Sequence, residues 1–195
     1  MTQPNIPELE PLTRTQILIV MGVTAVLLLA IAKVWQYLGA VALLPLDFTI
    51  NAWSAGIALA AGIIAASSVI YRLWPAYRRS ADIYLELVIK PLAWPDLIWL
   101  GLLPGLSEEL LFRGVILVAF GLDLVAAITS SLLFGILHFI GVQQWPYVVL
   151  ATVVGFVLSY SALITGNLLV PIIAHVLINL ISSSLWKATH LQIKN

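Results

Sequence analysis

The sequence predicts an all-α protein, a polytopic transmembrane helix bundle with about six spans. Apolar residues make up 62% of the 195 residues and charged residues only 9%, against about 25% charged in an ordinary soluble domain. Mean hydropathy is +1.06, and a soluble core of this size cannot bury that much apolar surface. The apolar residues also fall in runs of about 20, the length at which a helix crosses a bilayer.

The runs can be placed in order along the chain. The first is interrupted only by Lys33 near its end, where a long side chain can reach water. The second is rich in Gly and Ala, which suits close helix packing. A charged connector over residues 72–95 precedes the third. No Asp, Glu, Lys or Arg occurs from Leu124 to Trp186, which leaves room for about three more helices. The predicted spans are 17–38, 51–71, 96–119, 123–140, 146–164 and 168–186.

These spans divide the chain into four parts. Residues 1–16 form an N-terminal tail, and residues 17–95 hold two accessory spans and the charged connector. Residues 96–186 form a four-helix core, and residues 187–195 form a C-terminal tail. Within the connector, residues 83–89 are predicted to be a short amphipathic segment at the membrane interface.

The loop charges indicate an orientation. Every Lys and Arg other than Lys33 and Arg113 lies in the N-terminal tail, the connector or the C-terminal tail, and the opposite loops contain none. The positive-inside rule therefore predicts that both termini are cytoplasmic. A cleaved signal peptide over residues 17–42 is the alternative for the first span. The net acidic tail before it and the length of the apolar run argue against that.

Composition also excludes several classes of function. Nine Lys and Arg balance nine Asp and Glu, so there is no basic excess to bind nucleic acid. The chain has no Cys, which excludes disulfides, thiolate zinc sites and Cys nucleophiles. Serines in the apolar runs, such as Ser130 and Ser131, lack the strained-turn motif of serine hydrolases and are expected to pack helices.

Three charged residues lie inside the third predicted span. Carboxylates there are costly in contact with lipid, so we expect Glu108, Glu109 and Arg113 to face the bundle interior or a wet cavity. Glu109 precedes Arg113 by four residues, the favoured order for an ion pair on one helix face. Glu108 is rotated by about 100° from Glu109. These positions predict a structural Glu109–Arg113 pair and a separate functional carboxylate, Glu108; the alternative is a single structural cluster of all three.

Two further spans supply imidazole and amide groups. His138 lies in the fourth span, and His175 and Asn179 lie four residues apart on one face of the sixth. Each alone could be a hydrogen bond between helices. Together with Glu108 they could activate a water directly, or hold a zinc ion that does so. An Asn and a His can also stabilise an oxyanion. By simple counting, however, His138 and His175 differ in depth by about 10 Å.

At these residues the sequence resembles a known family. Residues 108–113 fit the motif EExxxR, residues 134–138 fit FxxxH and residues 175–179 fit HxxxN. The ordered trio, each member in its own apolar span, is similar to that of the CPBP family. This family contains CAAX proteases and bacteriocin-processing enzymes, and is also called Abi or type II CAAX prenyl endopeptidases. The resemblance covers residues 95–186.

The resemblance implies an intramembrane endopeptidase with a four-helix catalytic core, in a prokaryotic-type cell membrane or a related inner membrane. It implies that Glu108 and His138 activate the water and that His175 and Asn179 form the oxyanion site. Two mechanisms stay open: a metalloprotease with zinc on Glu108, His138 and His175, or a metal-free glutamate–water mechanism. The expected partners are a membrane-associated protein or peptide substrate and the lipid bilayer.

Two readings other than hydrolysis also stay open. One is a non-catalytic membrane adaptor or regulator that keeps the fold and binds a partner protein. The other is a small transporter with Glu108 as a proton relay, which so few spans make less favourable because they leave little room for inverted repeats.

Overall fold

The computed structural model describes residues 12–191, and within them every regular element is helical. The predicted fold class is therefore confirmed. Besides three one-turn or π-helical segments, η1 (Trp94–Asp96), η2 (Leu110–Ile116) and η3 (Val142–Gln144), the elements are α1 (Arg14–Gly39), α2 (Ile50–Leu73), α3 (Pro75–Ile89), α4 (Leu97–Glu109), α5 (Leu117–Ala119), α6 (Leu124–Leu137), α7 (Trp145–Thr165) and α8 (Leu169–Leu191).

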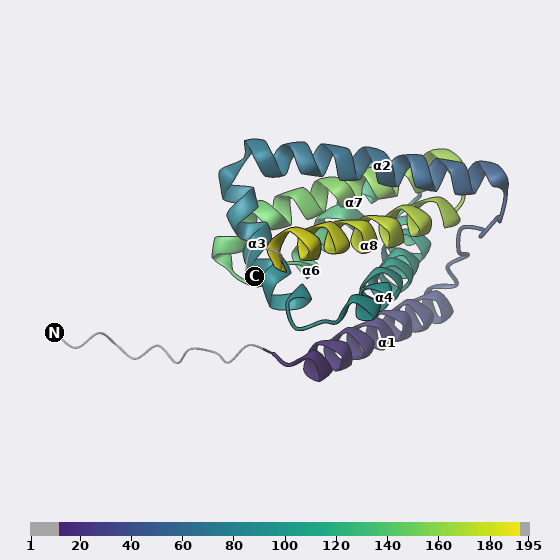
Figure 1. Cartoon of the computed structure of the whole chain (residues 1–195). Helices are drawn as coiled ribbons and strands as arrows, with labels where there is room; N and C mark the ends of the chain where they lie inside the picture. The colour runs from purple at the N-terminus through teal and green to yellow at the C-terminus, as the bar shows by residue number, and fades with distance from the viewer. Residues whose placement is uncertain (1–11, 192–195) are drawn as a thin grey trace.

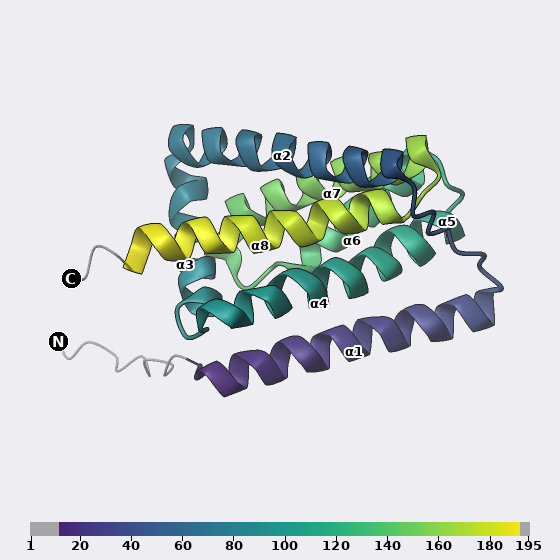
Figure 2. The same ribbon diagram turned by 45° about the vertical axis from the view of Figure 1, so that its right-hand side comes forward.

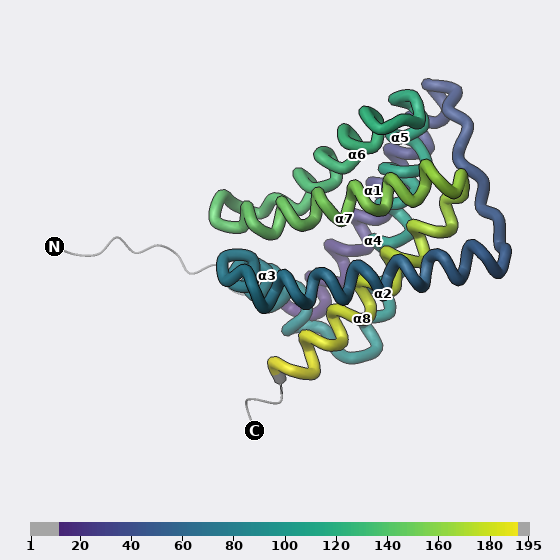
Figure 3. The backbone as a smooth tube through the Cα atoms, turned by 90° about the horizontal axis from the view of Figure 1, so that it is seen from above, coloured from purple at the N-terminus to yellow at the C-terminus, as the bar shows by residue number. Residues whose placement is uncertain are grey.

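The long helices run side by side, and α3 lies across one end of them (Figures 1 and 2). The α1–α2 and α7–α8 connections meet at the opposite end, where the Leu168 amide donates to the Pro45 carbonyl at 2.9 Å. Seen from above, α3 is viewed almost along its axis while α2 and α7 lie in the plane (Figure 3). The bundle therefore has one end closed by loops and one end covered by a crosswise helix.

Four helices are long and apolar enough to cross a membrane: α1, α2, the segment Val142–Thr165 that contains α7, and α8. The third predicted span is helical from residue 97 to residue 119 through α4, η2 and α5, and carries its three charged residues. The fourth is a shorter helix, α6, of 14 residues. All six predicted segments are thus helical, and six crossings stays a prediction.

Several predicted boundaries were wrong. The amphipathic segment predicted over residues 83–89 is part of a longer helix, because Pro75 occupies the first helical turn, where its missing N–H costs little, and α3 continues to Ile89. The C-terminal tail begins later than residue 187, since α8 continues to Leu191. At the other end, Thr13 and Gln16 form a capping box, so helix α1 starts inside the predicted tail. The tail predictions for residues 1–11 and 192–195 lie outside the described residues.

Small residues set the spacing around α8. An alanine Cβ at Gly105 of α4 would lie 2.5 Å from Val176 Cγ2 of α8, and one at Gly56 of α2 would lie 2.7 Å from Ile173 Cβ. Such contacts are closer than side chains allow, so these glycines let α4 and α2 approach α8 directly. Because α8 carries His175 and α4 carries Glu108, the same contact brings those two side chains toward each other.

Candidate active site

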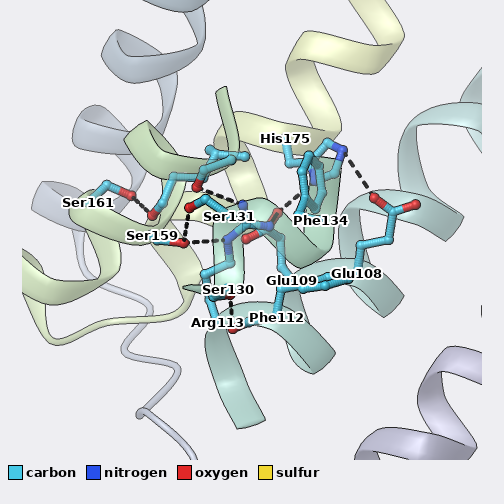
Figure 4. A network of polar contacts seen from close by, with 12 residues as sticks. Glu108, Glu109, Phe112, Arg113, Ser130, Ser131, Phe134, Ser159, Ser161 and His175 are labelled. Carbon is cyan, nitrogen blue, oxygen red and sulfur yellow. Dashed lines mark hydrogen bonds and ion pairs between the residues drawn. The ribbon is translucent and has the colours of Figure 1, made fainter. Parts of the chain in front are cut away.

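Helix geometry changes directly after the paired glutamates. Residues Leu110–Ile116 form a π-helical segment, a rare distortion that is frequent at functional sites. Arg113 in this segment is fully buried. Its guanidinium donates to Glu109 Oε1 at 2.7 Å, to the Gly155 carbonyl at 2.8 Å and to Ser159 Oγ at 3.2 Å (Figure 4). The ion pair predicted from the four-residue spacing is present.

Residues of α6 contact the π-helical segment through an aromatic ring and a hydroxyl group. The Arg113 guanidinium lies 4.5 Å from the centre of the Phe134 ring, a cation–π distance. Ser130 Oγ donates to the carbonyl of Phe112 in the π-helical segment at 2.8 Å. Ser131 Oγ donates within α6 to the Ala127 carbonyl at 2.5 Å. These serines make the helix-packing contacts expected of them.

Glu109 has a second partner that the sequence analysis missed. Its Oε1 also lies 2.7 Å from Nδ1 of His175. A carboxylate oxygen only accepts, so His175 donates from Nδ1. Glu109 therefore connects the buried Arg113 of one helix to the imidazole of another. Spacing along the third span could reveal the first bond but not the second, whose partners are 66 residues apart in the chain.

Glu108 points to the other side of this network. Its Oε2 lies 4.0 Å from His175 Nε2 (Figure 4), too far for a direct hydrogen bond. This oxygen is buried and has no hydrogen-bond partner. Two polar atoms 4.0 Å apart can both bond one water or one substrate oxygen between them. Glu108 is thus separate from the Arg113 network.

His138 is the C-cap of α6, not an interior residue of a span. Helix α6 ends at Leu137, and His138 Nδ1 lies 2.9 Å from the carbonyl of Phe134. Because a carbonyl only accepts, Nδ1 carries the hydrogen, and a neutral ring then keeps a free lone pair on Nε2. The Phe134 ring contacts both imidazoles, with ring centroids 4.8 Å from His138 and 5.7 Å from His175.

One cavity of about 200 Å³ is lined by all four residues predicted to be catalytic: Glu108, His138, His175 and Asn179. They come from α4, the end of α6 and two successive turns of α8. The depth difference estimated from the sequence therefore does not keep the two histidines out of a common cavity. Within the described residues, Glu108 and His138 form no direct ion pair.

The cavity is also lined by three tyrosines that the sequence analysis did not consider. Tyr77 and Tyr84 of α3 and Tyr147 of α7 contribute to its wall. Burial, and next to it the charge of Glu108, raise the pKa of the Tyr84 phenol to about 12, so this side chain stays neutral and keeps its hydroxyl hydrogen at physiological pH. The aromatic residues clustered in the connector were the sequence signal for this part of the wall. Their place in the cavity lining depends on the position of α3 in the fold.

The residues suggested for zinc do not fit a metal centre in this arrangement. Across residues 12–191, no group of three His, Asp or Glu side chains is placed to hold a metal ion. His175 Nε2 and Glu108 Oε2 lie 4.0 Å apart, but His138 does not complete a set of three ligands with them. We therefore assign no step to a metal.

The fold and the cavity define a class: a polytopic helical membrane protein with a buried carboxylate, two imidazoles and an amide in one cavity. Residues 90–181 match the family described as Type II CAAX prenyl endopeptidase Rce1-like. Over this segment the chain is similar to the Rce1-like family, which is described as one of CAAX prenyl endopeptidases. With four long apolar helices, the chain is an integral membrane protein.

A curated relative was also found. The "Uncharacterized protein YpbD" of Bacillus subtilis (strain 168) is 29% identical over 137 residues, which cover 70% of this chain and 70% of that protein. No solved structure matched the chain.

Proposed function

We propose that this protein is an intramembrane endopeptidase that hydrolyses a peptide bond of a membrane-associated protein or peptide. The observation that carries the proposal is the buried Glu108 Oε2, which has no hydrogen-bond partner and belongs to a residue lining a cavity with two imidazoles. Leaving a buried charged oxygen unsatisfied costs free energy, so such a group calls for a ligand. An attacking water is the ligand that hydrolysis requires.

Glu108 acts as the general base in this proposal. It removes a proton from the water while the water oxygen attacks the scissile carbonyl carbon. His138, with its free Nε2 lone pair, accepts the second hydrogen of the water and orients it. After the carbon–nitrogen bond breaks, Glu108 returns the proton to the leaving amine, so the products are a carboxylic acid and an amine.

Asn179 and His175 stabilise the oxyanion. The Asn179 amide donates in any protonation state, whereas His175 can donate from Nε2 only when doubly protonated, because Nδ1 is already bonded to Glu109. Glu109 accepts the Nδ1–H of His175 and thereby fixes the orientation of the imidazole. The second glutamate of the motif thus supports catalysis through His175 and Arg113 without touching the substrate.

The substrate is expected to reach the cavity from the membrane. Three of the four long apolar helices, α2, α7 and α8, contribute to the cavity wall, and the bilayer is accordingly the second partner. The orientation with both termini in the cytoplasm places α3 and the end of α6 on the cytoplasmic side. Cleavage is then expected near the cytoplasmic face of the membrane, where water is supplied.

The test compares new peptide termini in membranes from cells that express wild-type protein or Glu108→Gln, followed by cleavage of the identified substrate with purified protein. Glu108→Gln should abolish cleavage, because the water loses its base. Asn179→Ala should lower the rate by about 10²–10³, the usual loss for one oxyanion donor. Glu86→Gln, in an exposed pair with Lys90 on α3, is the matched control and should keep the wild-type rate.

Equal cleavage by wild type and Glu108→Gln would contradict the mechanism. If neither the membranes nor the purified protein yield a product, the non-catalytic adaptor becomes the better reading. The zinc alternative is tested by the same assay after chelation: lost activity that zinc restores would reinstate it.

A further inference from the structure

Part of the cavity wall comes from outside the segment that matches the family. The match begins at residue 90, whereas α3 ends at Ile89 and contributes Tyr77, Tyr84, Leu85 and Val88 to the lining. The groups proposed for water activation and oxyanion binding all lie within the match. This chain therefore surrounds a family-type centre with a wall from its own accessory helix.

The wall contains an ordered aromatic stack. The Tyr84 ring stacks on Tyr147 of α7 with centroids 4.4 Å apart and an interplanar angle of 19°. On the other side of the stack, Tyr77 lies 6.4 Å from Tyr147 at 10°. The Tyr84 ring is also 6.4 Å from the His138 ring. The stack thus extends from α3 to α7 and ends beside the proposed water-activating histidine.

Helix α3 is held at both its middle and its end. Asp82 accepts hydrogen bonds from Tyr71 Oη of α2 at 2.6 Å and from Trp186 Nε1 of α8 at 3.2 Å. The buried Lys187 of α8 donates to the carbonyls of Ile89 and Leu92 at 3.3 and 2.5 Å, which neutralises the negative end of the helix. These bonds hold α3 against α2 and α8.

Beside Tyr84 the cavity wall contains the apolar side chains of Leu85 and Val88, and the carboxylate of Glu108 lies close enough to affect the phenol. An acidic substrate side chain entering this part of the cavity would lose its water and be repelled by Glu108, which is costly. A bulky aromatic side chain would collide with the stacked rings of Tyr84 and Tyr147.

We infer that Tyr84 is a specificity-determining residue, whose ring limits one substrate side chain next to the scissile bond to small and medium size. This inference deepens the proposed function and rests on it. Removing the ring should enlarge the subsite, so that larger aromatic side chains are accepted. Replacing the phenol by a phenyl ring should leave the selection unchanged, because the ring and not the hydroxyl forms the wall.

The experiment uses a library of peptides from a digested membrane proteome, presented in detergent micelles, with cleavage sites identified by mass spectrometry. Wild type should show a position that lacks acidic residues, Phe and Trp. Tyr84→Ala should raise cleavage with Phe or Trp there at least ten-fold relative to Ala, and Tyr84→Phe should keep the wild-type profile. Tyr160→Ala, which removes an exposed tyrosine of α7, is the control.

The outcomes separate the two proposals. If wild type cleaves no peptide, the proposed function fails and the specificity role fails with it. If wild type cleaves and Tyr84→Ala lowers all rates by one common factor, the specificity role alone is overturned. Tyr84→Leu provides a second reading if Tyr84→Ala does not fold, because leucine keeps apolar packing while removing the stacked ring.

Discussion

At the scale of single residues, adjacent glutamates have different environments because a helix turns by about 100° per residue. Glu109 is fully buried and bonds Arg113 and His175 through one oxygen. Each glutamate has one buried oxygen without a hydrogen-bond partner, but only Glu108 lines the cavity. Glu109 therefore stabilises the helix bundle, while Glu108 is placed to bind a reactant in the cavity.

This division predicts different costs for two conservative changes. Glu109→Gln should destabilise the protein by about 3–5 kcal/mol, because the buried Arg113 loses its counter-charge. Glu108→Gln should cost much less, since its carboxylate makes no hydrogen bond through Oε2. Thermal unfolding of both variants in the same detergent measures the difference. Equal losses of thermal stability would refute the assignment of separate roles.

At the scale of helices, the contact between α4 and α8 depends on glycine. Gly101 and Gly105 are four residues apart on α4, and alanine Cβ atoms there would lie 3.1 Å from the Val176 carbonyl oxygen and 2.5 Å from Val176 Cγ2. This is the small-residue pattern that lets helix backbones approach in membranes. It follows that the distance between Glu108 and His175 depends on Gly101 and Gly105, which have no side-chain functional group.

Gly105→Ala should therefore push α4 away from α8. We expect a loss of about 1–3 kcal/mol from overpacking and a lower cleavage rate, because Glu108 is one turn further along α4. Gly62→Ala is the matched control, since no atom lies within 4 Å of its added Cβ. It should be neutral or stabilising by up to about 1 kcal/mol. A Gly105→Ala protein with wild-type unfolding temperature and rate would contradict this account.

A second contact between helices predicts a pH dependence. Arg14 at the start of α1 donates two hydrogen bonds to Asp96 before α4, at 2.6 and 2.8 Å. This guanidinium holds the pKa of the Asp96 carboxyl down at about 2, below its value of about 3.9 in an unfolded chain. The pair therefore stabilises the folded state above about pH 4 and loses this contribution as pH falls toward 2.

The measurement is the difference in unfolding temperature between wild type and Asp96→Asn across this range. Wild type should be more stable at neutral pH, and the difference should shrink between about pH 4 and pH 2. A difference that stays constant through that window would show that Asp96 acts through its shape alone.

At the scale of the whole molecule, the charge bias and the architecture predict one topology. The loops at the α1–α2 and α7–α8 connections share one end of the bundle, and α3 lies at the other (Figure 2). Apart from Lys33 and Arg113, the Lys and Arg residues belong to the connector that contains α3 and to the two predicted tails. We therefore expect α3 and both termini in the cytoplasm.

The absence of Cys from the sequence makes this prediction direct to test with single-cysteine variants. In intact cells, a membrane-impermeant maleimide should label Leu46→Cys and Phe120→Cys. It should label Ile83→Cys on α3 only after permeabilisation. All three positions are exposed. Labelling of Ile83→Cys in intact cells would reverse the topology.

The class and the helical segments could be predicted from the sequence alone, and the same reading proposed the residues of the candidate site. Apolar runs of membrane length show where helices form, and contacts between residues four apart, such as Glu109–Arg113, lie on a single helix and follow from its period. The predicted ends of the helices were less accurate, as at His138 and Lys187, because caps depend on local hydrogen bonds that hydropathy does not report.

Only the tertiary structure decided how the helices meet. The bond from Glu109 to His175 joins residues far apart in the chain, and the wall formed by Tyr84 depends on α3 folding back across the end of the bundle. Neither follows from local spacing, because relative helix positions depend on which small residues face each other and on buried hydrogen bonds between helices. The period of a helix specifies which face a residue occupies, and packing alone specifies what lies opposite.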